Sequence, residues 1–422
     1  MNTLRAIALI VRRSLRQHAL STTITALSVA LGVGLLMSVF AIQKQTLDAF
    51  TGGTAGFDAV FGPRGSKLQL VLNSVFHLEK SQGNLPWRMY QDIKRHPAVA
   101  EAIPYAVGDN YRDFRIVGTT TELFTDHEIR EGEKFQFQGD GRVFEPSRAE
   151  AIIGSFAARE TGLGVGDQFY SYHGLTFDES QIHADMVFTI VGVLEPTNTP
   201  ADRVIWVPLE AYYRMPGHWL QGSGVVYQPQ PGVPIPQEHK EVSAVMIKLK
   251  AASAGRMMEQ MINRQGNAAT FAWPIGQTLA DLFEKLGWAH RVLTLVAYLV
   301  MVVAAGSVLA SIYNAMNERR REFAILRALG ARRSVLVGAI VGESAAIAAL
   351  GAVVGFVVYF GLLALVSMVI RSQVGVIINV WQGHPVLWIG PLATVALGAL
   401  VGTVPAVKAY STDVATHLTP ST

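Results

Sequence analysis

The sequence predicts an α-helical membrane domain of four transmembrane helices, with a large mixed α/β extracytoplasmic domain inserted between helices 1 and 2. Only 16% of the residues are charged, whereas soluble domains usually carry about a quarter. The missing charge is concentrated in four uncharged stretches, Ser21–Ile42, Val292–Met316, Ser344–Ile370 and Pro385–Val407. Each stretch can span a bilayer, because about 20 helical residues cross the ~30 Å hydrocarbon core.

The four stretches also set the expected order of segments along the chain. The first stretch follows twenty residues and exceeds the roughly 7–15 apolar residues of a signal peptide, so we expect a retained helix. The expected segments are a cytoplasmic amphipathic N-terminus (1–20), transmembrane helix 1 (21–43), a periplasmic α/β domain (44–285), transmembrane helix 2 with a stalk (286–316), a cytoplasmic segment (317–333), transmembrane helix 3 (334–370), a short periplasmic link (371–384), transmembrane helix 4 (385–409) and a cytoplasmic tail (410–422).

Arginine placement predicts the orientation of these helices. Arginines gather in residues 1–20 and 317–333, whereas the link 371–384 holds only Arg371. Because cytoplasmic loops carry an excess of Lys and Arg, both termini and the 317–333 segment are expected in the cytoplasm. Residues 44–285 are then periplasmic. The formal net charge of +3 thus reflects membrane topology, and no nucleic-acid partner is expected.

Residues 4–16 form an amphipathic pattern. Leu4, Ile7, Ala8 and Val11 share one helical face, and arginines occupy the rest. The pattern suits a helix that lies on an anionic membrane surface. Charge that only fixes topology explains it equally well.

The 44–285 block alternates strand and helix signals. Residues 184–196 and 203–207 are apolar enough for buried strands, and 85–99 have the proline boundaries of a short helix. The Asn, Pro and Asp residues of 198–203 indicate a turn. Residues 215–240 are rich in proline and glycine, which predicts a long loop.

Several kinds of chemistry are missing from the sequence. It contains no cysteine, no Gly-Lys pair of a Walker A loop, and neither G-x-S-x-G nor H-E-x-x-H. We therefore expect no catalytic residues and no cofactor in this chain. One cluster could in principle gather a metal, but its spacing matches no strong pattern and a solvated loop explains it better, so no metal site is predicted. Its members are His173, Asp178, Glu179, His183 and Asp185.

The charged segment "NERRREFAILRALGARRS" (317–334) interrupts the apolar half of the chain. At about 100° per residue its apolar side chains share one face and its central arginines the other. Gly330 can take the positive φ that ends a helix. Two interpretations remain open from these residues, an interfacial turn that holds topology and a docking helix for a cytoplasmic partner.

The last two membrane stretches contain small residues at helix-packing spacing. Three G-x-x-x-G patterns occur, and they favour close contact among the four helices over a dimer seam. Glu343 would be costly at mid-bilayer, so we expect it near the inner interface or in a polar contact with another helix. The residues expected to pack are Gly338, Gly342, Glu343, Gly351, Gly355, Gly398 and Gly402.

Residues 317–359 closely resemble the FtsX-like permease domain of type VII ABC transporters, the family of MacB-type efflux permeases, LolC, LolE and FtsX. The family pattern N-E-R-x-x-E-x-A-I-L-R-A-L-G-A, followed by Glu and a glycine-rich helix, is matched from Asn317 to Gly330 and at Glu343, Gly351 and Gly355. Residues 152–169 and 188–213 are also similar to the periplasmic core of MacB-type permeases.

The resemblance implies a non-catalytic permease subunit in the bacterial cytoplasmic (inner) membrane. ATP and Mg would be bound by a separate cytoplasmic ABC ATPase, and the permease would pair with a second copy or a homologue. Segment 317–333 would be the coupling helix for mechanotransmission, through Glu318, Arg319, Arg320, Arg321, Glu322, Phe323, Ile325, Leu326, Arg327, Leu329 and Gly330.

The resemblance leaves the purpose of that coupling open. Relatives export or extract lipoproteins, peptides or small molecules, and they work with a periplasmic adaptor, a substrate-binding protein or an outer-membrane partner. An FtsX-like regulator of a periplasmic cell-wall hydrolase is the alternative within the family. A membrane sensor that transports nothing is the alternative outside it.

Overall fold

The computed structural model describes most of the chain and divides it into two compact units. One unit comprises Met1–Gln45, Leu286–Met368 and Asn379–Thr422, and the other comprises Thr46–Lys285 and Val369–Ile378. We call them the membrane unit and the sheet unit. The described residues are 3–174, 182–230, 232–264, 266–285, 287–319, 322, 325, 332–374 and 384–411.

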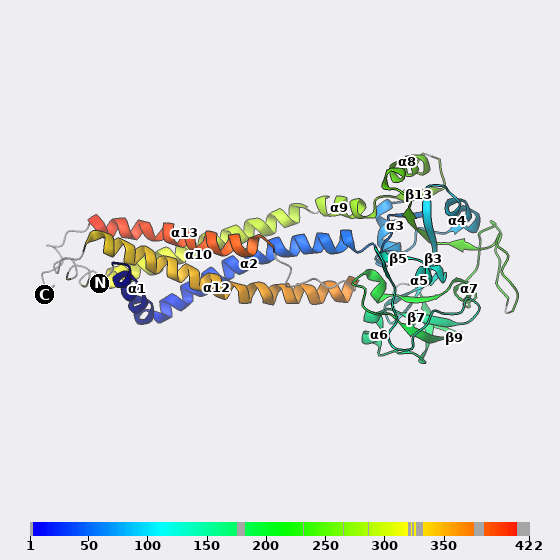
Figure 1. Cartoon of the computed structure of the whole chain (residues 1–422), viewed down its shortest axis with the longest axis horizontal. Coiled ribbons are helices and arrows are strands. Elements are labelled where there is room, and N and C mark those ends of the chain that lie inside the picture. The colour runs from blue at the N-terminus through cyan, green and yellow to red at the C-terminus, as the bar shows by residue number, and fades with distance from the viewer. Residues whose placement is uncertain are drawn as a thin grey trace. The chain divides into compact units, whose positions relative to one another are not determined.

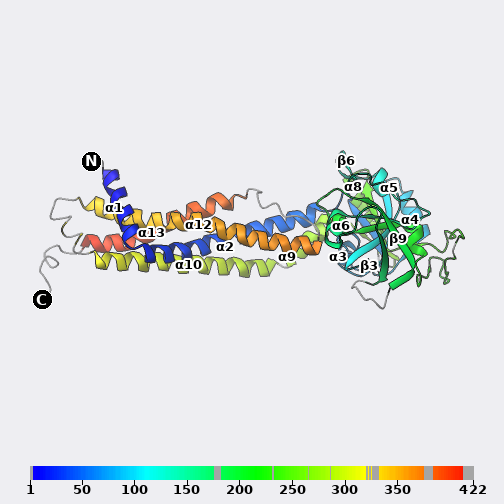
Figure 2. The same ribbon diagram turned by 90° about the horizontal axis from the view of Figure 1, so that it is seen from below.

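Within the described residues, four helices are long and apolar enough to cross a membrane. They are α2 (Ala19–Gly52), α10 (Gly287–Glu318), α12 (Arg333–Val374) and α13 (Val386–Ser411). Figures 1 and 2 show them side by side, with the shorter α1 (Thr3–Gln17) next to them. Together with the α/β domain between the first two, these helices confirm the predicted fold class.

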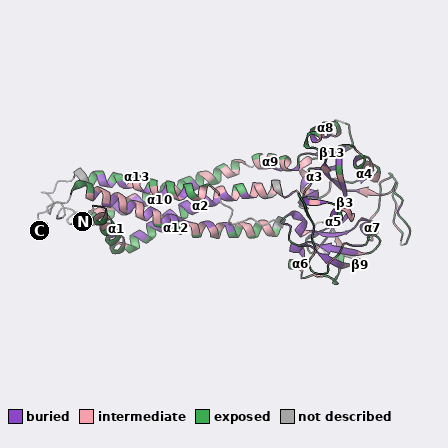
Figure 3. Ribbon diagram, viewed as in Figure 1, coloured by how far each residue is buried: buried purple, intermediate pink, exposed green. Residues whose placement is uncertain are grey.

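The membrane unit leaves apolar side chains on its outer surface. Val302, Val353, Val357 and Leu392 are each more than two-thirds exposed, and Figure 3 shows exposed residues along the outer sides of the helices. Water would disfavour such a continuous apolar surface, whereas lipid tails would cover it without cost. The surface therefore fits a membrane environment.

A nine-stranded sheet forms the centre of the sheet unit. Its strand order is β13-β1-β12-β3-β4-β10-β7-β9-β8, and β8 also pairs with the end of β3. The β10–β4 and β7–β9 pairs are parallel and the others antiparallel. The strands are β1 (Ala59–Pro63), β3 (Val99–Tyr111), β4 (Phe114–Thr119), β7 (Glu150–Ile153), β8 (Gln168–His173), β9 (Ile182–Val193), β10 (Ile205–Pro208), β12 (Ala244–Leu249) and β13 (Ala269–Ala272).

Short elements complete the sheet unit. Two small ladders join β2 (Leu85–Pro86) to β11 (Glu241–Val242) and β5 (Glu128–Arg130) to β6 (Glu133–Lys134). The helices are α3 (Lys67–Ser74), α4 (Trp87–Lys94), α5 (Glu122–Thr125), α6 (Ser155–Thr161), the 3-10 helix η2 (Pro200–Arg203), α7 (Leu209–Tyr213), α8 (Ala252–Ile262) and α9 (Ile275–Lys285). Strands β9 and β10 and helix α4 confirm the strand and helix signals read from the sequence.

Burial explains why the central strands are apolar on both faces. Trp206 on β10 is 1% exposed and belongs to one core cluster, whereas its neighbours Ile205 and Val207 belong to another. Successive strand residues point to opposite faces, so β10 is covered on both sides. A strand in that position must be apolar throughout.

Candidate functional site

The segment that leaves α10 is the predicted site of ATPase coupling. Glu318 ends α10, and its Oε2 atom lies 3.4 Å from Nδ1 of His18. The structure also describes Arg319, Glu322 and Ile325, of which Ile325 is 45% exposed. The other predicted residues lie outside the described residues, namely Arg320, Arg321, Phe323, Leu326, Arg327, Leu329 and Gly330.

A polar cluster joins this segment to α1 and α12. Nη1 of Arg319 lies 3.8 Å from Oε2 of Glu343 on α12, and Nε of Arg319 donates to Glu322 at 3.0 Å. The hydroxyl of Ser14 on α1 donates to Oε1 of Glu343. Arg319 and Glu343 are each only 8% exposed. Buried charges of this kind persist only when paired, so the cluster fixes α10, α12 and α1 to one another.

Each glycine of the predicted packing patterns faces another helix. A Cβ atom at Gly351 would come within 2.6 Å of Val29 on α2, and one at Gly355 within 2.3 Å of Val33. Side chains larger than hydrogen would therefore push α2 and α12 apart. Of the remaining glycines, Gly338 and Gly342 face Ile7 and Val11 of α1, and Gly398 and Gly402 face Ala348 and Ser344 of α12.

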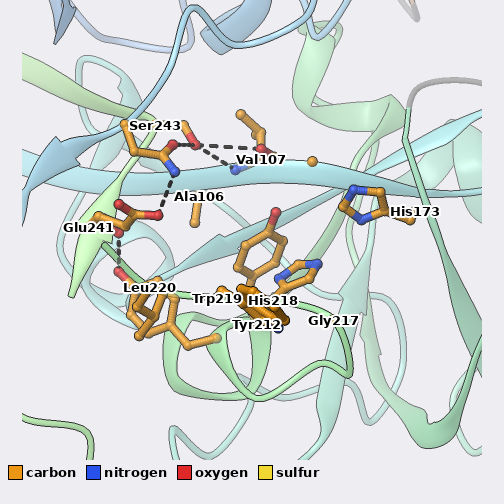
Figure 4. Close-up of a pocket in the computed structure, with 13 residues that line it drawn as sticks. Ala106, Val107, His173, Tyr212, Gly217, His218, Trp219, Leu220, Glu241 and Ser243 are labelled. Carbon is orange, nitrogen blue, oxygen red and sulfur yellow. Dashed lines mark hydrogen bonds between the residues drawn. The ribbon is translucent and has the colours of Figure 1, made fainter. Parts of the chain in front are cut away.

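The sheet unit contains a cavity of about 380 Å³ beside the middle of β3. Figure 4 shows hydrogen bonds that fix its polar wall: the Asn84 amide donates to Oε1 of Glu241 at 2.7 Å, and the Ser243 hydroxyl donates to Asn84 at 2.9 Å. Burial raises the pKa of the Glu241 carboxyl. The hydroxyl of Tyr213 donates to the backbone carbonyl of Glu241. The wall is thus held by its own polar groups.

Two histidines and an aspartate meet at the rim of this cavity. Asp109 on β3 is fully buried, and β8 places His173 directly opposite it in the ladder. Nδ1 of His173 lies 3.1 Å from Oδ1 of Asp109, and Nε2 of His218 lies 3.1 Å from Oδ2. The hydrogen bond that the His173 imidazole donates to the Asp109 carboxylate raises the pKa of His173.

These three side chains are the ones within the described residues whose types and spacing suit a metal ion. Of them, the sequence pattern singled out only His173, and it grouped that residue with near neighbours instead. Asp178 and Glu179 lie outside the described residues, as do the side chains of His183 and Asp185.

Family models match most of the chain. Residues 22–265 match the MacB-like periplasmic core domain, which covers more than half of the sequence, and residues 294–414 match the FtsX-like permease C-terminal domain. The chain belongs to the MacB/FtsX-like permease family. The match confirms the family that the 317–359 segment resembled.

Two solved structures show distant similarity to this permease. The periplasmic region of MacB from Actinobacillus actinomycetemcomitans is 9% identical, with a TM-score of 0.34 over 55% of this chain and 94% of that one. The extracellular domain of the noncanonic ABC-type transporter YknZ from Gram-positive bacteria is 14% identical, with a TM-score of 0.27 over 51% and 99%. Comparison with curated protein sequences gives no match.

Membership of the family defines the general role of the permease. MacB/FtsX-like permeases are subunits of ABC transporters, and ATP hydrolysis takes place in a separate protein. The family therefore implies an ABC ATPase as a partner. It also agrees with the four described helices that are long and apolar enough to span a membrane, and with the α/β domain between the first two.

Proposed function

We propose that this permease couples ATP hydrolysis by a separate cytoplasmic ATPase to movement of its 44–285 domain in the periplasm. The coupled movement would export or extract a substrate such as a lipoprotein, a peptide or a small molecule. The observation that carries the proposal is the buried pair of Arg319 and Glu343. A push on the segment after α10 would reach α12 as well as α10, because this pair joins the two helices.

Segment 317–333 has the composition that a docking helix needs. Leu326 and Leu329 would enter an apolar groove of the ATPase, and Arg320, Arg321 and Arg327 would meet acidic residues at its rim. Buried apolar anchors supply most of the affinity of such interfaces, and charges at the rim supply orientation and speed of association. Because the partner hydrolyses ATP, no Mg or nucleotide site is proposed for this chain.

The same proposal fixes the orientation and assembly of the permease. Both termini and segment 317–333 would lie in the cytoplasm of a bacterium, with the permease in the inner membrane. Two permease chains would flank the ATPase dimer, either as identical copies or as homologues. A periplasmic adaptor, a substrate-binding protein or an outer-membrane protein would receive the movement of the 44–285 domain.

The proposal is tested by co-expressing the permease with the ABC ATPase encoded beside it. The two chains should co-purify in detergent, and the permease reconstituted in lipid should change the ATPase rate. The double variant L326D/L329D should insert and fold normally but lose both properties, because carboxylates would be forced into an apolar groove. Leu326 and Leu329 are preferred to Arg319 for this test, since a change at Arg319 would also disturb the buried pair with Glu343.

A charge-reversal pair controls for the basic character of the segment. R320E/R321E should weaken the complex and make it less sensitive to salt. R12E/R13E changes two exposed arginines on α1 and should leave co-purification unchanged. Normal complex formation and normal ATPase stimulation by L326D/L329D would refute the docking role.

A further inference from the structure

We propose that Asp109, His173 and His218 form a binding site for a divalent transition-metal ion such as Zn²⁺. The three side chains offer two imidazole nitrogens and one carboxylate, and their ligand atoms all lie within 4.8 Å of one another. The proposal is independent of the ATPase partner, because every ligand belongs to the sheet unit.

The distances suit a small tetrahedral ion. Ligand atoms about 2.0–2.2 Å from a tetrahedral Zn²⁺ lie about 3.3–3.6 Å from one another. Nδ1 of His173 is 3.1 Å from Oδ1 of Asp109, and Nε2 of His218 is 3.3 Å from that same oxygen. The two imidazole rings stand at 75° to each other with centroids 5.6 Å apart. The widest pair of ligand atoms is at most 4.8 Å apart, so one imidazole would turn toward the ion on binding, and His173, whose side chain is 55% exposed, has the room to do so.

The surrounding fold holds the ligands in place. Asp109 and His173 are opposite each other in the β3–β8 ladder, so their backbones are fixed by sheet hydrogen bonds. The imidazole of His218 packs on the ring of Tyr212, with the ring centroids 4.8 Å apart and the planes at 64°. The backbone N–H of His218 also donates to the Met215 carbonyl in a turn. Surrounding residues of this kind orient the side chains that bind a metal ion.

Burial favours a cation at this position. The Asp109 side chain is completely buried and the His218 side chain is 9% exposed. A carboxylate removed from water is stabilised by a nearby positive charge. Nitrogen and oxygen ligands together select borderline ions such as Zn²⁺ and Co²⁺ over Ca²⁺ or Mg²⁺, which take oxygen ligands.

The site has an accessible side. Both His173 and His218 line the cavity of about 380 Å³, and Figure 4 shows the imidazole of His218 beside the ring of Tyr212. Three protein ligands leave a fourth tetrahedral position for water or for an anionic group of a ligand. Within the described residues the site has three protein ligands, whereas a structural zinc site has four, so we expect an exchangeable ion at the mouth of the cavity.

Metal binding would also fix the 215–240 loop. Within this segment the described residues form no helix or strand, and an isolated bridge between Leu220 and Tyr227 supplies the β pairing. His218 belongs to this loop, whereas Asp109 and His173 belong to the sheet. The ion would therefore tie the loop to β3 and β8 and hold it over the cavity.

The test uses the full-length permease, purified with a tag that contains no histidine and stripped with a chelator. Titration with Co²⁺ should give the intense visible absorption of a tetrahedral site, saturating at one ion per chain. Zn²⁺ should displace Co²⁺ and abolish this absorption. The permease should also compete with a chromophoric chelator for Zn²⁺. H218A and H173A should each weaken Zn²⁺ binding by at least about 100-fold, beyond the ~10–100-fold effect of losing an outer partner of a metal ligand.

H239A is the matched control, because His239 belongs to the same loop but stacks on Tyr227 and bonds to Ser223. It should still bind one ion per chain with wild-type affinity. Zn²⁺ should also protect the 215–240 loop from proteolysis in the wild type and in H239A, but not in H218A. Thermal unfolding of each variant in chelator tests whether it folds normally. If H218A misfolds, H173A is used for the affinity and proteolysis measurements in its place. Absence of stoichiometric binding, or unchanged affinity in H173A and H218A, would overturn the proposal.

Discussion

His77 gives the sheet unit a specific sensitivity to acid. Burial, together with the charges of Arg115 and Arg203, lowers the pKa of its imidazole to about 3, whereas the unfolded chain has an ordinary value near 6.5. Below pH ~6.5 the His77 imidazole therefore binds a proton in the unfolded chain but not in the folded chain. The free energy of unfolding falls by about 1.4 kcal/mol per pH unit in that range. Between pH 7 and pH 5 the loss from His77 alone is about 2 kcal/mol.

The replacement H77N isolates this contribution. The backbone of His77 has φ of 57°, and asparagine tolerates that left-handed conformation better than most residues. Urea unfolding of wild type and H77N in mild detergent, followed by tryptophan fluorescence, is suitable because the His77 ring lies 6.0 Å from that of Trp206. H77N should be less stable than wild type at pH 7, owing to lost packing. However, it should lose about 2 kcal/mol less than wild type between pH 7 and pH 5.

The comparison between the two proteins removes the effect of other titrating groups, since these are common to both. H96N, at a partly exposed histidine of the same unit, tests for any general effect of a histidine-to-asparagine change. The reasoning is refuted if wild type and H77N lose the same stability between pH 7 and pH 5.

Two further predictions concern the membrane unit. E343A should destabilise it by about 1–3 kcal/mol, because the change removes one of two carboxylate partners of the buried Arg319 and the acceptor of the Ser14 hydroxyl, while Glu322 still pairs with Arg319. Thermal unfolding in detergent measures the loss, and an effect as small as that of the exposed-site variant E318A would contradict the buried pair. G355L should separate α2 from α12, since its Cβ atom alone would meet Val33 at 2.3 Å. A cysteine pair across the two helices should cross-link less readily in G355L than in G361L, because Gly361 has open space around it. Equal cross-linking in the two variants would count against close packing.

The membrane helices could be predicted because lipid imposes a rule that acts along the sequence. A spanning helix must satisfy its backbone internally and present apolar side chains over about 20 residues. That rule leaves a mark on contiguous residues, as in Val292–Met316. The same holds for β9, which is apolar on both faces because both faces are covered. The membrane helices and β9 could therefore be predicted because burial acts on residues that are contiguous in the sequence.

The Asp109, His173 and His218 cluster could not be predicted from spacing, because its members meet through the sheet. Asp109 and His173 become neighbours only once β8 returns to pair with β3, an extra pairing at the end of the strand order. This contact leaves no trace in the hydrophobic periods of 2 or 3.6 residues from which strands and helices are predicted. The sequence pattern pointed to His173 but offered only its near neighbours as companions. The one remaining signal was the position of His218 in a proline-rich loop, and it says nothing of a partner.

The polar turn at 198–203 shows an intermediate case. The sequence predicts a turn from Asn198, Pro200 and Asp202, and the structure has a 3-10 helix there. What local chemistry did not reveal is how deeply Asp202 is buried. Its carboxylate accepts hydrogen bonds from the backbone and hydroxyl of Thr197 and from the backbone of Asn198. Burial raises the pKa of this carboxyl despite those bonds.

The buried pair of Arg319 and Glu343 restricts how a push from the ATPase could travel, if segment 317–333 is the coupling helix that we propose. Moving the segment without α12 would separate the pair, and leaving one member of a buried pair alone costs about 3–5 kcal/mol. Moving α10 and α12 together keeps the pair and the Ser14 hydrogen bond intact. Glycine contacts at Gly351 and Gly355 extend the same connection to α2. Concerted displacement of these helices is therefore the movement of lower energy, and the coupling that we propose would follow it.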